Sequence, residues 1–220
     1  MIDHGVNIIK GGAMFKGTPE IIVQRREEIV NACEKLYETM SFKDITLKEI
    51  SSVTSFSRPT IYNYFHTKEE IFLALFEREY ERWNADLEMI LNSEKNCTGR
   101  ELADKIAKSL ERRTQLLKLL SMNNYDMEEN SREELLASFK TDYGKSMRLF
   151  REILVKYCPD MSDTEVEQVM YIFFPFMFGI YPYAEVTAKQ KAAMAEAEVD
   201  YRYQSVYGIT YNCLMRLLNR

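Results

Sequence analysis

A short stretch of the chain concentrates side chains that form hydrogen bonds in fixed directions. Arg58 carries a planar guanidinium that can donate two parallel hydrogen bonds, and Asn63 can both donate and accept through its amide. Pro59 adds an apolar ring next to Arg58 in the sequence. In the major groove of DNA, these groups suit a guanine, another base edge and a thymine methyl group. The three residues therefore offer the chemistry of direct base recognition.

Hydroxyl groups and one ammonium group surround these three residues in the sequence. Such groups commonly bind phosphate oxygens, which position a protein on the duplex without reading its sequence. We expect the following residues to contact the DNA backbone: Thr46, Ser57, Thr60, Tyr62, Tyr64 and Lys68.

Two short helices joined by a tight turn would hold these side chains in place. Thr46 and Glu49 have the spacing of a capping box, which predicts that the first helix begins at Leu47. Ser57 is a suitable N-cap for the second helix. Pro59 is tolerated in a first helical turn because the amide that it lacks would have no partner there.

The second helix is predicted to cover residues 58–65. Ile61 and Phe65, four residues apart, lie on its inner face. The residues left pointing elsewhere are Arg58, Thr60, Asn63 and Tyr64. This is a helix-turn-helix pattern, in which the second helix enters the major groove. A small helical hairpin, with its tyrosines in the core and its polar residues in solvent, would show the same spacing.

The run SRPTIYNYFHTKEEI, from Ser57 to Ile71, resembles the signature of tetracycline-repressor (TetR) family transcriptional regulators. That signature is a serine, three residues, an aliphatic residue, a tyrosine, any residue, a histidine or tyrosine, a phenylalanine and then a lysine followed by an acid. Ser55-Phe56 stands where the family often has Gly-Val in the turn. The match continues upstream, over about the first third of the chain, through Ile29, Ala32, Leu36, Phe42, Thr46 and Ile50. The resemblance implies a dimeric, all-helical regulator, usually a repressor that a small ligand releases.

The overall charge limits where DNA can bind. The 220 residues carry a net charge of -5, with a pI near 5.3, which argues against a generally basic protein that coats nucleic acid. DNA contact must then be made by one face. No apolar run approaches the roughly 18 to 20 uncharged residues needed to span a bilayer, so no membrane partner is expected.

The cysteine pattern indicates neither a metal nor a cofactor. Cys33, Cys97, Cys158 and Cys213 are far apart in the sequence, with no CxxC pair and no histidine at ligand spacing. Reduced thiols in a chain without a signal peptide are typical of a cytoplasmic protein.

Two alternatives to a ligand-controlled regulator remain. In a small all-helical enzyme, His4 and His66 would be the only histidines, and no nucleophile or phosphate-binding glycine loop accompanies them. The other alternative is a constitutive DNA-binding regulator whose second domain only dimerises.

Caps and breaks predict an all-α chain with four parts. We expect a disordered extension over residues 1–17, in which Met14 would be the natural start, and a three-helix helix-turn-helix domain over 18–67. A connecting helix over 68–91 would then lead to a larger helical domain over 92–220, for ligand binding and dimerisation. The further helices are predicted over residues 19–40, 99–121, 132–157, 163–183 and 188–218, with a short piece or loop at 124–130. Capping boxes are predicted at Thr98/Glu101, Ser131/Glu134, Ser162/Glu165 and Thr187/Gln190.

Aromatic and methionine side chains are frequent in the second domain. Such stripes usually form plain core, but as a set they could line a pocket for a planar, mainly apolar ligand. Pro175 would help by kinking its helix and opening space. The candidate ligand residues are Met122, Tyr125, Phe139, Tyr143, Met147, Phe150, Tyr171, Phe174 and Phe178. A cation held by Tyr125 and the acids that follow it is a weaker alternative.

The last predicted helix has more apolar face than one core needs. Its stripe is formed by Val199, Tyr203, Val206, Thr210, Cys213 and Leu217. With the helix over residues 163–183 it could build a two-fold, four-helix interface, as the resemblance suggests, although an internal bundle would use the same stripe. A homodimer would place two recognition helices on a palindromic operator.

Overall fold

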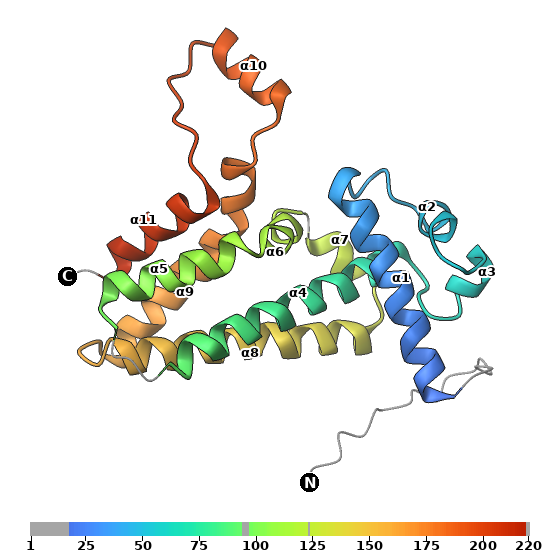
Figure 1. Ribbon diagram of the computed structural model, residues 1–220, viewed down its shortest axis with the longest axis horizontal. Helices are drawn as coiled ribbons and strands as arrows, with labels where there is room; N and C mark the ends of the chain where they lie inside the picture. The colour runs from blue at the N-terminus through green and yellow to red at the C-terminus, as the bar shows by residue number, and fades with distance from the viewer. Residues whose placement is uncertain (1–17, 94–96, 123, 219–220) are drawn as a thin grey trace. The chain divides into compact units, whose positions relative to one another are not determined.

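A computed structural model describes residues 18–93, 97–122 and 124–218 (Figure 1). Within those ranges every regular element is an α-helix, which confirms the all-α prediction. The chain divides into two compact units, one ending at Ile71 and one beginning at Phe72. The predictions for residues 1–17, including a start at Met14, fall outside the described residues.

The first unit is the helix-turn-helix. Its elements are α1 (Pro19–Thr39), α2 (Leu47–Ser52), α3 (Arg58–Ile61) and the first turn of α4 (Lys68–Leu91). Thr46 caps α2 as predicted, because its side chain accepts a hydrogen bond from the Lys48 amide at 3.2 Å. The core that joins these helices consists of fully buried side chains: Ile29, Cys33, Ile45, Ile50, Ile61, Phe65 and Ile71.

The recognition helix α3 is shorter than predicted. It ends at Ile61, whereas the sequence pattern predicted a helix to Phe65. After Ile61, the amides of Asn63 and Tyr64 bond to carbonyls three residues back, at 3.1 and 2.9 Å. Such bonds wind the chain more tightly than an α-helix, so they change the directions in which the following side chains point.

The second unit is a helical bundle. After α4 its elements are α5 (Gly99–Glu111), α6 (Thr114–Leu120), α7 (Asn124–Glu129), α8 (Glu133–Tyr157), α9 (Asp163–Ala184), α10 (Ala188–Glu196) and α11 (Val206–Leu218). α9 packs against α6, α8 and α11, and α11 also packs along α5. Large rings fill the core: Phe72, Phe76, Tyr80, Trp83, Phe150 and Phe173.

Side-chain caps begin several of these helices. Complete capping boxes form as predicted at Thr98/Glu101, Ser162/Glu165 and Thr187/Gln190. The predicted box of Ser131 and Glu134 is wrong, because α8 begins one residue later than expected and has Arg132 as its N-cap. Ser131 Oγ is instead buried without a hydrogen-bond partner among the described residues.

Two helices, α5 and α6, stand where one helix over residues 99–121 was predicted. At the break, Arg113 leaves helical geometry with φ -113° and ψ 40°. Arg113 Nε and Arg112 Nη2 both donate to the carboxylate of Asp86 on α4, at 2.8 and 3.4 Å, and Asp86 is only 3% exposed. Neighbours on a continuous helix point about 100° apart, so the break allows two adjacent arginines to pair with one buried charge.

The helix predicted over residues 188–218 is also divided. Residues 197–205, between α10 and α11, are not helical, and Glu198 has a positive φ of 54°. The rings of Tyr201 and Tyr203 pair with each other 5.0 Å apart within this returning segment. The predicted stripe is therefore wrong in its first part: Tyr203 lies outside α11.

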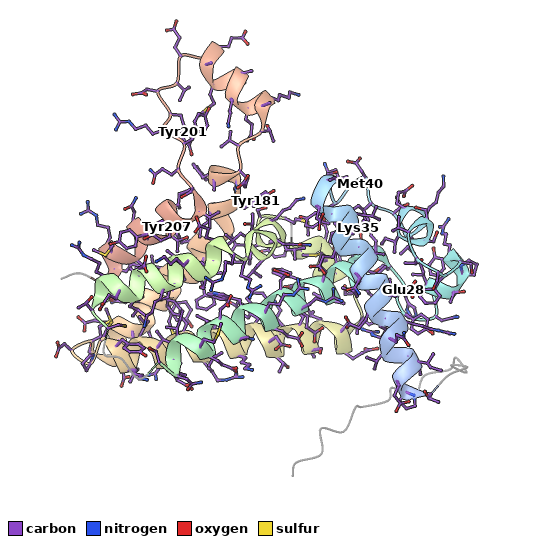
Figure 2. All side chains as sticks on the ribbon, viewed as in Figure 1. Glu28, Lys35, Met40, Tyr181, Tyr201 and Tyr207 are labelled. Carbon is purple, nitrogen blue, oxygen red and sulfur yellow. The ribbon has the colours of Figure 1, made fainter. Side chains whose placement is uncertain are left out.

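Residues 185–205 form an arm that projects from the bundle (Figure 1). Figure 2 shows Tyr201 in this arm, apart from Tyr207 at the start of α11. Among the described residues, no single helix is both long and apolar enough to cross a membrane, although α9 and α10 together pass that test as a pair bent by 81°.

Candidate DNA-binding face and apolar cavity

Contacts from α1 hold the helix-turn-helix in position. Arg26 places its guanidinium carbon 4.5 Å from the centroid of the Phe65 ring. Glu28, labelled on α1 in Figure 2, accepts a hydrogen bond from the Ser55 amide at 2.6 Å. This bond fixes the turn between α2 and α3 at the position where the sequence departs from Gly-Val. Sequence reasoning missed it because no local pattern links the two partners, which are 27 residues apart.

The three side chains predicted to face bases are exposed. Arg58, Pro59 and Asn63 all lie at the surface, next to the fully buried Ile61. Arg58 Nη2 donates to the Tyr62 hydroxyl at 3.3 Å. This contact orients the guanidinium and leaves its other N–H groups for an acceptor such as a guanine edge.

Most of the predicted phosphate-binding hydroxyls are accessible as well. Thr46, Ser57 and Tyr62 are exposed, and Thr60 is half-buried. Ser57 Oγ and Thr60 Oγ1 are hydrogen-bonded to each other at 2.9 Å. Because a hydroxyl can both donate and accept, this pair can still bind a phosphate oxygen.

Tyr64 does not point away from the protein as the helical spacing predicted. Its side chain is only 6% exposed, because the tight turns after Ile61 direct it inward, and its hydroxyl accepts a hydrogen bond from Arg25. Lys68 is half-buried, with Nζ donating to the Phe42 carbonyl at 2.8 Å. An ammonium has three N–H donors, so two of them remain for a phosphate.

The segment that carries these residues is locally basic. Between Ser41 and Lys68, four basic side chains outnumber the two acidic ones, although the whole chain is acidic. A positive segment on a negative protein favours DNA at this surface and disfavours it elsewhere.

A cavity of about 370 Å³ lies between α8 and α9, inside the second unit. Its lining is aromatic, thioether and proline: Tyr143, Met147, Met170, Tyr171, Phe174, Pro175 and Phe178. Most of the residues predicted to bind a ligand therefore come together here. The volume falls at the lower end of the range for small-molecule sites.

The other predicted ligand residues lie elsewhere. Phe139 packs 4.9 Å from the Phe76 ring, and Phe150 stacks on Phe173 at the same distance, so both belong to the core. Tyr125 is 83% exposed on α7. Met122, half-buried after α6, does not line the cavity either. Phe139 and Phe150 were predicted because they share a helical stripe on α8 with Tyr143 and Met147. Only the middle of that stripe, Tyr143 and Met147, borders the cavity.

The cavity contains no charged side chain among the described residues that line it. Its polar groups are the hydroxyls of Tyr143 and Tyr171, and burial, together with the nearby Tyr171, raises the pKa of Tyr143. Pro175 has no N–H, so the Tyr171 carbonyl lacks its usual helical donor. These features suit a neutral, mainly apolar ligand with one or two hydrogen-bonding groups.

Two family descriptions match this sequence. "Bacterial regulatory proteins, tetR family" matches residues 29–75, and "Tetracyclin repressor-like, C-terminal domain" matches residues 77–202, which is more than half of the chain. The chain belongs to the TetR family. It is a DNA-binding transcriptional regulator, and the resemblance found in the sequence is confirmed. The α2–turn–α3 segment lies within the DNA-binding match.

Solved structures of several regulators share the fold. The fatty acid degradation regulator FadR from Bacillus halodurans is 14% identical, with a TM-score of 0.58 over 93% of this chain and 97% of that one. FadR from Bacillus subtilis, in complex with stearoyl-CoA, is 16% identical, with a TM-score of 0.56 over 88% and 97%. Thermus thermophilus FadR, in complex with lauroyl-CoA, is 19% identical, with a TM-score of 0.55 over 88% and 93%. A search of curated proteins found no match.

The described part of this TetR-family regulator contains no group of three or more His, Cys, Asp or Glu side chains that could hold a metal ion. All four cysteines are free thiols. Burial raises the pKa of the Cys97, Cys158 and Cys213 thiols, which keeps them protonated and weakly nucleophilic near neutral pH.

Proposed function

We propose that this TetR-family regulator binds a palindromic operator as a homodimer and leaves it when a compact, neutral, mainly apolar ligand fills the cavity between α8 and α9. The observation that carries the ligand part is the uncharged lining of that cavity. A cytoplasmic location follows from a DNA target, and a regulator of this kind needs no catalytic residues.

On the DNA side, Arg58, Pro59 and Asn63 read base edges. Their exposure above a fully buried Ile61 supports this assignment. The phosphate contacts are made by Thr46, Ser57, Thr60, Tyr62 and Lys68. We assign Tyr64 a positioning role instead, because its ring is buried and its hydroxyl bonds to Arg25 on α1.

The homodimer is supported by an apolar face on α9. Tyr171 is 72% exposed, Ile172 51% and Tyr183 59%, and these residues recur along one helix. A face of large exposed apolar side chains is typical of a protein interface. A two-fold dimer formed through this face would contain two copies of α3. Because each copy reads one half-site, the operator should contain two matching half-sites.

The ligand class follows from what the cavity lacks. Two of the FadR structures hold an acyl-CoA, whose nucleotide part carries several negative charges. A cavity of about 370 Å³ without a cationic side chain offers no partner for such charges. An acyl chain or an aromatic ring fits its lining, so most of the binding free energy should come from burial of the apolar part of the ligand.

A thermal-shift screen tests the ligand class. Neutral substituted aromatics, medium-chain fatty acids and acyl-CoAs are compared at equal concentration. A ligand present at one hundred times its Kd adds about 2.7 kcal/mol to the free energy of unfolding, which raises the Tm by roughly 5 to 10 °C. We expect the neutral aromatics to give the largest shifts. Strong shifts from acyl-CoAs alone would reject a compact neutral ligand, and no shift from any class would favour a constitutive regulator.

Selection of random duplexes on the purified protein tests the DNA part. The enriched sequences should contain two inverted half-sites, and adding a ligand from the screen should release the labelled duplex in a gel-shift assay. Enrichment of a single, non-repeated site would reject the dimeric operator.

A further inference from the structure

A second cavity lies where the returning part of the arm meets α9 and α11, and we call it the arm pocket. Its volume is about 330 Å³, close to that of the cavity between α8 and α9, yet the two have no lining residue in common. Its apolar walls are the side chains of Phe176 and Tyr183 on α9, Tyr201 in the arm and Ile209 on α11. The arm pocket is therefore a separate candidate site, in the lower part of the volume range of small-molecule sites.

Contacts within the chain fix the arm side of this pocket. The rings of Tyr183 and Tyr201, the latter labelled in Figure 2, lie 6.4 Å apart, and the Tyr201 hydroxyl donates to the Tyr183 carbonyl at 3.4 Å. Asn212 Nδ2 on α11 donates to Gln204 Oε1 at 3.3 Å. The returning part of the arm is thus attached to both helices that form the rest of the pocket, so the walls are in place without a ligand.

The polar groups of the arm pocket are mainly hydrogen-bond donors. Arg202 carries five N–H groups, and among the described residues it forms no ion pair, although Asp200 lies two residues before it. The amide oxygen of Gln204 accepts the bond from Asn212, which leaves the amide NH₂ group as a donor. None of the described residues that line the pocket is acidic. A guanidinium and an amide that both donate suit a carboxylate, which can accept two parallel bonds from an arginine.

Gly179 leaves space open on the α9 side of the pocket. It lies inside α9, where glycine is less favourable than any residue except proline. Apart from its chain neighbours and the backbone of its own helix, no described atom lies within 4 Å of a Cβ built at this position. Packing within this chain therefore does not require a glycine here, and the space that it preserves is available to a ligand.

We propose that the arm pocket binds a compact aromatic carboxylate. The ring of the ligand packs against the aromatic walls and fills the space over Gly179. The carboxylate accepts hydrogen bonds from Arg202 and Gln204. Because the cavity between α8 and α9 has no charged lining, the two sites select different classes of ligand. Binding at the arm pocket requires neither the operator nor the neutral ligand of the proposed function.

Isothermal titration calorimetry with 2-naphthoate tests the site in the full-length protein. The matched ligands are 2-naphthamide, which keeps the rings and loses the charge, and octanoate, which keeps the charge and loses the rings. All three are titrated into the Met147→Trp variant, in which the cavity between α8 and α9 is filled. We expect one 2-naphthoate per chain and at least about tenfold weaker binding of the other two. No binding of 2-naphthoate, or equal affinity for either matched ligand, would overturn the proposal.

Two substitutions in the otherwise unchanged chain test the two parts of the pocket. Arg202→Gln should weaken 2-naphthoate binding about tenfold. Arg216→Gln, at an exposed arginine of α11 that does not line the pocket, is the matched control and should leave the Kd unchanged. Gly179→Leu should abolish binding because its side chain fills the pocket. Urea unfolding should show no loss of stability in this variant, since leucine is a better helix former than glycine. An unchanged Kd in either Arg202→Gln or Gly179→Leu would overturn the site.

Light scattering separates a small ligand from a second copy of this chain as the occupant. The pocket adjoins, through Tyr183, the exposed α9 face assigned to the homodimer. We expect Gly179→Leu to keep the oligomeric state of the parent. A parent dimer that becomes monomeric with Gly179→Leu would mean that the second copy fills the pocket, which overturns the ligand site and leaves the homodimer intact. Binding of 2-naphthoate that survives Gly179→Leu and is lost in Met147→Trp would overturn the arm pocket and leave the cavity of the proposed function intact.

Discussion

Arg25 on α1 and Tyr64 beyond α3 are 39 residues apart in the sequence, yet Arg25 Nη1 donates to the Tyr64 hydroxyl at 3.2 Å. Arg26, the next residue, donates to the Tyr64 backbone carbonyl at 3.5 Å. α1 therefore donates hydrogen bonds to both the side-chain hydroxyl and the backbone carbonyl of Tyr64. Because Tyr64 directly follows the exposed Asn63, the two bonds also set the position from which Asn63 reaches outward.

Tyr64→Phe should remove the side-chain bond without changing the packing of the ring. We expect the free energy of unfolding to fall by about 1 kcal/mol, the usual net value of such a bond. Binding to the selected operator should weaken more than binding to random DNA, since the displaced neighbour is a base reader. Urea unfolding and gel shifts on both duplexes measure these effects. Equal losses on the two duplexes would indicate that Tyr64 contacts phosphate instead.

Arg58→Ala and Tyr62→Phe should affect DNA binding in different ways. Loss of the guanidinium should relax the preference at one base pair of each half-site by about 1 to 3 kcal/mol. Loss of the Tyr62 hydroxyl should weaken binding to all sequences, because a phosphate contact carries no sequence information. Competition with single-base variants of the operator distinguishes the two. If Arg58→Ala lowers affinity equally for operator and random DNA, the base-reading role is wrong.

The sequence predicted those features that local pattern determines. The starts of α5, α9 and α10 follow from a hydroxyl residue and its partner three residues later, and those capping boxes form. α2 also begins after its predicted cap, although Thr46 accepts its backbone hydrogen bond from Lys48 and contacts Glu49 only through the side chains. The cavity was foreseen in part because Tyr143 and Met147 repeat at helical spacing. Phe150 has the same spacing, yet it stacks on Phe173, and the sequence gives no sign of which part of a stripe faces a core.

Features that depend on distant partners could not be predicted. At the break between α5 and α6, the adjacent Arg112 and Arg113 both donate hydrogen bonds to the buried carboxylate of Asp86, which lies on α4. In the turn between α2 and α3, Ser55 stands where the family often has glycine, and its amide donates a hydrogen bond to Glu28 on α1. In both cases the decisive group lies more than twenty residues away, outside any window in which helical spacing can be read.

Asp86→Asn should destabilise the second unit. The substitution keeps the size of the side chain but removes the charge that accepts bonds from Arg112 and Arg113. Because Asp86 is buried and its partners are partly exposed, we expect a loss of about 2 to 3 kcal/mol in urea unfolding. Lys108→Ala is the matched control, since it breaks the more exposed pair with Asp104 and should cost less than about 1 kcal/mol. Similar losses in both variants would contradict the structural role of the break.

Met147→Trp should fill the cavity and abolish the ligand response. The larger ring occupies space between α8 and α9 that a ligand would need, so thermal shifts should disappear while operator binding persists. Met89→Trp is the control, because Met89 is 65% exposed on α4 and lines no part of this cavity. The control should respond to ligand as the parent does. A normal response in Met147→Trp would place the ligand outside this cavity.

Alkaline pH should destabilise the protein through its buried phenols. Burial, with a smaller contribution from Tyr143, raises the pKa of Tyr80 far above the value of about 10 that holds in an unfolded chain. The stabilisation is therefore complete below about pH 10, where neither state ionises, and is lost as pH rises and only the unfolded state releases the proton. Urea unfolding at several pH values above 10 should show that Tyr80→Phe loses about 1.4 kcal/mol less per pH unit than the parent. The same slope in both proteins would mean that Tyr80 ionises while folded, and the ring cluster around it would then have to admit water.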